Sequence, residues 1–210
     1  MTVRGEQRLS IAGPAGNLEL ALNLPEHAPR GIALIAHPHP LQGGTMDNKV
    51  VQTLAKTFAA LGYASVRFNF RGVGGSAGSF DDGAGETDDA LAALAHARAE
   101  YGELPVVLAG FSFGSFVQTR VAERHAPERM VLVGPAVGRF GAATVPADTI
   151  VIHGEEDDVV ALADVFAWAR PQQLPIVVFP GCGHFFHGRL VELQRVITGM
   201  WRPAAAAART

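Results

Sequence analysis

A serine between two glycines is the segment of this sequence with the clearest chemical potential. Gly110-Phe-Ser-Phe-Gly114 directly follows an apolar run, Pro105-Val-Val-Leu-Ala109, and precedes a stretch of helical character. This spacing is typical of a sharp strand-to-helix turn that strains the serine backbone and crowds the positions two residues away, where only glycine fits. Ser112 would then lie at a helix N-terminus, whose free N–H groups favour an oxyanion. The pattern predicts a nucleophilic serine.

A serine hydroxyl needs a histidine to accept its proton and a carboxylate to orient that histidine. Candidates for both follow later strands. The run His153-Gly-Glu-Glu-Asp-Asp158 places carboxylates after one predicted strand, and Pro180-Gly-Cys-Gly-His184 places a histidine in a glycine-flanked loop after the next. Open α/β sheets build their sites at this carboxyl edge. The order serine, acid, histidine is that of the α/β-hydrolases.

Apolar runs alternate with helical patterns along the chain. We expect strands at Leu18–Leu24, Gly31–His37, Tyr63–Phe70, Pro105–Ala109, Arg129–Val133, Thr149–His153 and Pro175–Phe179, and helices near Asp47–Leu61, Glu86–Tyr101, Phe113–His125, Ala161–Arg170 and Phe186–Trp201. The alternation predicts a three-layer α/β fold, with a mainly parallel, twisted sheet and helices on both faces. Too few residues join the first two strands for a crossover helix, so we expect that N-terminal pair to be antiparallel.

The length and composition limit the class of protein. With 210 residues, 48% of them hydrophobic, the chain can form one substantial core, so we expect a single domain over residues 1–202 and a frayed tail at 203–210. The stretch Gly134–Asp148 is too short for a lid domain, which predicts an open site. A formal charge of −3, with Lys49 and Lys56 as the only lysines, argues against nucleic acid and anionic membranes as partners.

The cysteine content and the N-terminal segment favour a cytoplasmic location. A single cysteine, Cys182, excludes an internal disulfide and fits a reducing compartment. Residues 1–10 contain no apolar core long enough for a signal peptide, and no later segment approaches the length of a membrane span. We therefore expect a cytoplasmic protein without a membrane partner.

Over nearly its whole length the chain resembles the α/β-hydrolases, and among them the small lidless carboxylesterases related to dienelactone hydrolases. The matching segments are Ala36-His-Pro-His-Pro-Leu-Gln-Gly-Gly-Thr-Met-Asp-Asn-Lys49, Asn69-Phe-Arg-Gly-Val-Gly-Gly-Ser-Ala-Gly78, the turn around Ser112, the run His153–Asp158 and Gly183-His-Phe185. The resemblance implies Ser112 as the nucleophile, His184 as the base and Asp157, at the family's spacing from Gly154, as the orienting acid. Many dienelactone hydrolases carry cysteine in place of this serine, so the resemblance does not extend to their specific substrate.

An oxyanion hole needs two N–H donors. One is the amide of the residue after the nucleophile, Phe113. The other comes from the loop that begins at His37, where the two prolines have no N–H to offer. Related enzymes place this donor two positions after the histidine that ends the strand, which points to His39, with Leu41 as the alternative.

Several other interpretations of these residues compete. Asp158 or Asp164 could replace Asp157 as the acid, since charged residues surround it. His37 and His39 could begin a metal site, but we find no further ligands in the sequence, and a metal is not expected. Cys182 could be a thiol nucleophile, although a free buried thiol is far commoner.

A glycine-rich loop supports a different class of protein. Gly72-Val-Gly-Gly-Ser-Ala77 fits a dinucleotide-binding fingerprint and follows a strand, as an oxidoreductase would require. Further loop residues intervene before the next helix, however, and no strand ending in an acid follows at the required distance. We expect the loop instead to pass beneath the active site, with Arg71 paired to Asp81, Asp82 or Glu86. A binding protein that has kept the fold and lost catalysis is a third hypothesis.

The sequence thus predicts a serine hydrolase that cleaves small or short-chain carboxylic esters through an acyl-enzyme on Ser112. Its partner would be a small-molecule ester, and no cofactor is expected. Thioesterases, lactonases and peptidases use the same three residues, so the reaction subclass stays open at this point. The natural substrate and the oligomeric state cannot be read from the residues.

Overall fold

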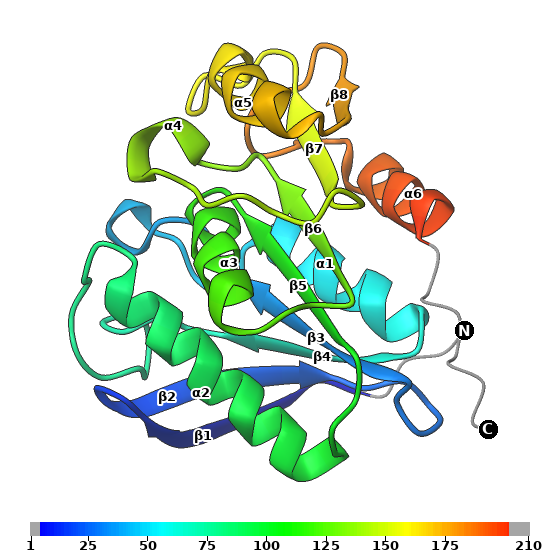
Figure 1. Cartoon of the computed structure of the whole chain (residues 1–210). Coiled ribbons are helices and arrows are strands. Elements are labelled where there is room, and N and C mark those ends of the chain that lie inside the picture. Colours follow the sequence, from blue (N-terminus) through cyan, green and yellow to red (C-terminus); the bar gives the residue numbers. More distant parts are fainter. Residues whose placement is uncertain (1–4, 202–210) are drawn as a thin grey trace.

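A computed structural model describes residues 5–201 and contains one eight-stranded sheet (Figure 1). The strand order is β1-β2-β4-β3-β5-β6-β7-β8. The strands are β1 Gln7–Gly13, β2 Gly16–Asn23, β3 Gly31–Ala36, β4 Tyr63–Phe68, β5 Val106–Phe111, β6 Arg129–Val133, β7 Ile150–Gly154 and β8 Ile176–Phe179. The helices are α1 Lys49–Ala60, α2 Ala84–Tyr101, α3 Phe113–Arg124, α4 Val137–Phe140, α5 Leu162–Ala169 and α6 Leu190–Met200, with short 3₁₀ turns η1 Pro40–Gln42 and η2 Arg170–Gln172.

The strand directions confirm the predicted α/β fold. All pairs from β4 to β8 are parallel, and β2 runs antiparallel to both of its neighbours, β1 and β4. The five predicted helices are all present, and Gly134–Asp148 holds only the short helix α4 in place of a lid. The predicted tail at 203–210 lies outside the described residues. Within residues 5–201, no helix combines the length and the apolar character needed to cross a bilayer.

The expected pairing of the first two predicted strands is wrong. The strand β2 lies beside β4, with Leu20 opposite Phe68 and Leu22 opposite Val66, because both edges of β3 are occupied by β4 and β5. The sequence analysis also missed β1, whose polar residues are exposed along the edge of the sheet. Only the partly buried Leu9 and Ile11 of this strand pack against the core.

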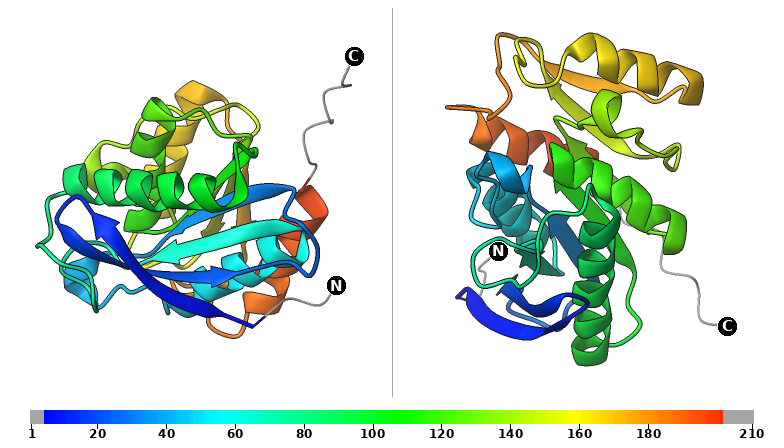
Figure 2. Two further views of the ribbon diagram at one scale, coloured as in Figure 1. Left: turned by 90° about the horizontal axis from the view of Figure 1, so that it is seen from below. Right: turned by 90° about the vertical axis from the view of Figure 1, so that its left-hand side faces the viewer.

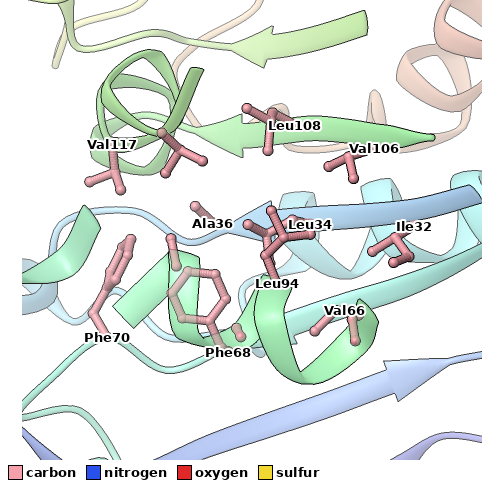
Figure 3. Packing of buried hydrophobic residues seen from close by; sticks show 14 of the residues in the cluster. Ile32, Leu34, Ala36, Val66, Phe68, Phe70, Leu94, Val106, Leu108 and Val117 are labelled. Atoms are coloured by element: carbon pink, nitrogen blue, oxygen red, sulfur yellow. The ribbon is translucent and has the colours of Figure 1, made fainter. Parts of the chain in front are cut away.

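Helices cover both faces of the sheet because its central strands are apolar on both sides. Figure 2 shows α2 and α3 on one side of the sheet and α1 on the other, where α6 packs against α1. Side chains of β3 alternate between these layers: Ile32 and Leu34 join the cluster beneath α2 and α3 (Figure 3), whereas Ile35 joins the cluster beneath α1 and α6. The sheet is therefore a rigid platform whose loops carry the chemistry.

The loops after β3, β5, β7 and β8 all leave the sheet at its carboxyl edge, because these strands are parallel. They contain, respectively, His39, Ser112, Asp157 and His184. Four segments far apart in the sequence are thereby brought to one edge, which is where open α/β sheets bind ligands.

His37 joins the carboxyl ends of β3 and β4. The side chain is fully buried, its Nδ1 donates to the carbonyl of Pro38 at 2.7 Å, and its Nε2 accepts from the amide of Phe70 at 3.0 Å. Both ring nitrogens therefore serve the backbone. Burial is the main cause that lowers the pKa of His37 to about 3, although the bond to Pro38 opposes this shift.

The lowered pKa of His37 predicts a loss of stability in acid. Unfolding frees the imidazole to take a proton near its ordinary pKa of 6.5, whereas the folded state resists protonation down to about 3. The stability that His37 contributes is therefore complete above pH 6.5 and is lost as the pH falls from there towards 3. Urea unfolding between pH 6.5 and 4.5 should give a pH slope that is shallower in His37→Gln than in the parent chain, by about 1.4 kcal/mol per pH unit. Equal slopes for the two proteins would contradict this assignment.

Candidate active site

Ser112 occupies the strained turn that the glycine pattern predicts. Its backbone has φ 57° and ψ −120°, a region that residues with a side chain rarely adopt. A Cβ added at Gly110 would lie 2.6 Å from backbone atoms of Gly114, and one added at Gly114 would lie 2.3 Å from the carbonyl oxygen of Ala36. Both glycines are therefore required sterically. The amide of Ser112 donates to the carbonyl of Val133 at 2.9 Å, which ties the turn to β6.

The structure places the predicted acid and base in contact. Nδ1 of His184 lies 2.6 Å from Oδ2 of Asp157, and both side chains are buried. Ser112, which is 6% exposed, lines the same small hollow as His184. The three residues that the sequence analysis proposes for catalysis are thus linked by one hydrogen bond, between His184 and Asp157, and one shared hollow, between Ser112 and His184.

The loop itself holds Asp157 in its ionised form. Oδ1 accepts from the amides of Val159 and Val160 at 2.9 Å and 2.7 Å, while Oδ2 faces His184. Burial raises the pKa of Asp157, but the bonds from His184 and from these two amides outweigh it, so the pKa lies below its ordinary value. A charged, fully bonded carboxylate can hold the histidine in the Nδ1–H tautomer.

The neighbouring acids occupy different environments. Asp158, Glu155 and Glu156 are exposed, and the carboxylate of Glu155 accepts from the amide of Gly181 at 2.9 Å. Asp164 lies on α5, where its carboxylate would be 3.1 Å from a Cβ added at Gly138. Among these acids only Asp157 bonds to His184.

His153 is a site residue to which the sequence analysis gave no role. It is fully buried at the end of β7, its Nε2 lies 2.9 Å from the carbonyl of Val160, and the same nitrogen is 3.4 Å from Oδ2 of Asp157. Burial lowers the pKa of His153, so the neutral ring donates its Nε2–H to the loop. Its place four residues before Asp157, in the run His153–Asp158, was the available signal in the sequence.

The ring of His184 packs against Phe111 and lies close to the backbone of Gly134. Its ring lies 4.8 Å from the ring of Phe111, and a Cβ added at Gly134 would approach its Cε1 to 3.2 Å. Phe185 also contacts the imidazole, with ring centroids 5.1 Å apart, and is partly exposed. The base is therefore held in place by packing on its sides and by Asp157 at Nδ1.

The loop after β3 contributes His39 to the wall of the hollow beside Ser112. His39 and Phe113 line the same hollow as the nucleophile, and their rings pack 5.0 Å apart. The amide of Leu41 already donates to Nδ1 of His39 at 3.2 Å, and the Leu41 side chain is 72% exposed. Within residues 5–201, the amides of His39 and Phe113 are not donated to any protein acceptor. Of the two candidates for the second donor, the geometry therefore favours His39.

Two hollows flank Ser112. The first, of about 180 Å³, has walls made of small and apolar side chains together with the charged Arg139 and Asp164; its lining is His39, Gln42, Ser112, Phe113, Ala136, Gly138, Arg139, Phe140, Val159, Val160 and Asp164. The second, of about 70 Å³, lies on the side of His184 and is lined by Pro38, His39, Gln42, Gly43, Gly44, Asn48, Ser112, Val159, His184 and Phe185. Phe111 and Phe186 line neither hollow and belong to the cluster beneath α1 and α6.

In the glycine-rich loop after β4, the carboxylate of Glu19 takes the position that a bound phosphate would need. Oε2 of Glu19 accepts from the amide of Gly75 at 2.9 Å and from Nδ2 of Asn69 at 2.7 Å, where a phosphate would need free N–H groups. The prediction for Arg71 is wrong in its main partner, because two bonds of 2.9 and 3.0 Å join its guanidinium to Asp89, three residues after Glu86. Asp81 is a weaker partner at 3.8 Å.

Cys182 is a free, buried thiol, as predicted. Its side chain belongs to the cluster beneath α1 and α6, and burial raises the pKa of the thiol. A raised pKa disfavours the thiolate that a nucleophile requires.

Comparisons with known proteins agree with this geometry. Residues 28–141 match the family model described as serine aminopeptidase, S33. An uncharacterized protein of Rickettsia prowazekii is 34% identical over 203 residues, which cover 88% of this chain and 84% of that protein.

Two solved structures are similar along almost the whole chain. A serine hydrolase without a lid from Xanthomonas campestris is 39% identical, with a TM-score of 0.89 and coverage of 96% of this chain and 97% of that one. A serine hydrolase homologue from Coxiella burnetii is 37% identical, with a TM-score of 0.84 and coverage of 93% and 97%. The protein therefore belongs to the α/β-hydrolase family whose model is described as serine aminopeptidase, S33, and to its lidless serine hydrolases.

Proposed function

We propose that the protein hydrolyses small carboxylic esters through an acyl-enzyme on Ser112. The observation that carries this proposal is the 2.6 Å bond between His184 and a buried, ionised Asp157, beside a strained serine that lines the same hollow. This set of groups has the composition of an acyl-transfer triad, with the bond between acid and base already formed.

Each residue has a defined part in the reaction. Nε2 of His184 takes the proton of the Ser112 hydroxyl as its Oγ attacks the acyl carbon. The amides of Phe113 and His39 donate to the oxyanion that forms, and Asp157 stabilises the imidazolium. His184 then gives its proton to the departing alcohol oxygen. A water molecule, deprotonated by the same histidine, then attacks the acyl carbon; the bond to Ser112 Oγ breaks, His184 returns the proton to Oγ, and the acid is released.

The dimensions of the site support a small acyl group. The hollow beside the oxyanion donors measures about 180 Å³, less than the volume typical of sites for drug-sized ligands. The stretch that could have formed a lid contains only α4, which leaves the site open. The free, buried thiol of Cys182 is typical of a reducing compartment, so we place the enzyme in the cytoplasm.

Amide cleavage is the second candidate, because the matching family model is described as a serine aminopeptidase. The same residues can attack an amide, whose nitrogen leaves after protonation by His184. Aminoacyl arylamides therefore belong in the substrate panel beside esters, thioesters and lactones.

A fluorophosphonate should inactivate the protein with one covalent adduct, because an activated serine beside oxyanion donors reacts rapidly with such phosphorus centres. Mass spectrometry of tryptic peptides should locate the adduct on Ser112. The Ser112→Ala variant should remain unlabelled and should lose ester hydrolysis. An adduct on Cys182, or an absence of labelling in the parent protein, would refute the proposed nucleophile.

Substitution of each aspartate in turn should show whether Asp157 or the adjacent Asp158 orients His184. Asp157→Asn should lower kcat by about 10⁴-fold, the effect of the same exchange in a serine protease triad, because the amide favours the wrong histidine tautomer. The matched control Asp158→Asn alters an exposed side chain and should cost less than about tenfold, equivalent to about 1.4 kcal/mol. Steady-state kinetics on one ester measures both, and a reversed order of effects would assign the acid to Asp158.

Acyl-chain length should strongly affect the rate. Acetyl and butyryl esters fit a hollow of about 180 Å³, whereas longer chains extend into water. Between butyrate and palmitate esters of one phenol, kcat/KM should fall by about tenfold or more, equivalent to about 1.4 kcal/mol of transition-state binding. Emulsified triglycerides should give no jump in rate. A preference for them would show that the site is closed by an element that we have misjudged.

A further inference from the structure

The two hollows beside Ser112 can be assigned to the two halves of an ester. The group that leaves must lie next to His184, because His184 gives it a proton. The hollow of about 70 Å³ contains His184 and therefore receives the alcohol part. The hollow of about 180 Å³ contains Phe113 but not His184, and it therefore receives the acyl part.

The alcohol side continues away from the reacting bond. Asn48 and Phe185 line both the small hollow and a neighbouring one of about 170 Å³. This further hollow, which we call the outer hollow, is completed by Lys49, His187, Gly188 and Leu190. Phe185 thus forms a shared apolar wall between them, and the outer hollow lies where a substituent of the alcohol would reach.

The outer hollow offers a positive charge without a negative one. No carboxylate lines it, and Lys49 has no ion-pair partner among the residues that the structure describes. The adjacent acid, Asp47, is already paired with two arginines, at 2.6 Å to Arg8 and 3.3 Å to Arg67. The hollow on the acyl side has no such excess of positive charge, because it is lined by both Arg139 and Asp164, whose charges have opposite signs.

We propose that the natural substrate is an ester whose alcohol part carries a carboxylate or phosphate, bound by Lys49 with His187 in the outer hollow. An unpaired ammonium beside an apolar aromatic wall suits an anionic group on a ring or short chain, and it disfavours a cationic one. This inference rests on the proposed ester hydrolysis and adds the chemical class of the leaving group.

Two acetate esters test the inference because they differ only in charge at the far end of the alcohol. One is 4-acetoxybenzoate, an anion, and the other is 4-acetoxybenzamide, its neutral counterpart. The measured quantity is the ratio of kcat/KM for the anion to that for the neutral ester. Differences in intrinsic reactivity between the esters cancel when this ratio is compared between protein variants.

Removal of the Lys49 charge should lower the ratio. We expect Lys49→Gln to reduce it about threefold to fivefold, the size of an exposed ion pair, and Lys49→Arg to retain it. The matched control is Lys56→Gln, since Lys56 is the other lysine of the chain and lies on the same helix, α1, outside the outer hollow. Lys56→Gln should leave the ratio unchanged, and 0.5 M NaCl should lower it in the parent protein by screening.

The outcomes separate the two proposals. If the parent protein hydrolyses the neutral ester but Lys49→Gln keeps the parental ratio, the leaving-group inference is wrong and the proposed function stands. An equal loss on both esters in Lys49→Gln would also overturn it, because such a loss reflects catalysis or folding and not charge recognition. If neither acetate ester, nor any other ester, is hydrolysed, both proposals fail.

Discussion

The contact between the first turn of α3 and the end of β3 determines the geometry of the whole site. No side chain fits between them, since a Cβ at Gly114 would lie 2.3 Å from the carbonyl oxygen of Ala36 and 2.6 Å from that of His37. The helix that follows Ser112 therefore touches the end of the strand from which the loop with His39 departs. One close approach sets the distance between two backbone amides, on Phe113 and His39, that belong to segments more than 70 residues apart.

Asp157 and His184 form a second unit that is built separately from the first. Asp157 is fixed by the amides of its own loop, and His153 ties that loop back to the end of β7. His184 meets this unit from the loop after β8 and is pressed against Phe111, the last residue of β5. The strand β5 is therefore common to both units, because Ser112 directly follows it and its last residue, Phe111, packs against His184.

Features of this structure that follow from local steric rules could be predicted from the sequence. Features that depend on the pairing of distant segments could not. Gly110 and Gly114 predicted the turn, because the steric constraint that requires glycine at these positions acts over a few residues. Asp157 followed from the family's spacing, and its burial next to the exposed Asp158 gives that choice a physical basis. The place of β2 beside β4, and the pairing of Arg71 with Asp89, depend on which distant segments meet, which no local pattern encodes. His153 acts through a carbonyl and a carboxylate in the following loop, and its place four residues before Asp157 is the one sign of this in the sequence.

The backbone of Ser112 has an evolutionary consequence. A non-glycine residue at φ 57° and ψ −120° costs about 1–3 kcal/mol, a noticeable fraction of the stability of a domain. Glycine would relieve that cost at this position, so the most stabilising exchange in the turn is also one that deletes the hydroxyl. A descendant of this chain that no longer needed the proposed chemistry would gain stability by losing the Ser112 hydroxyl.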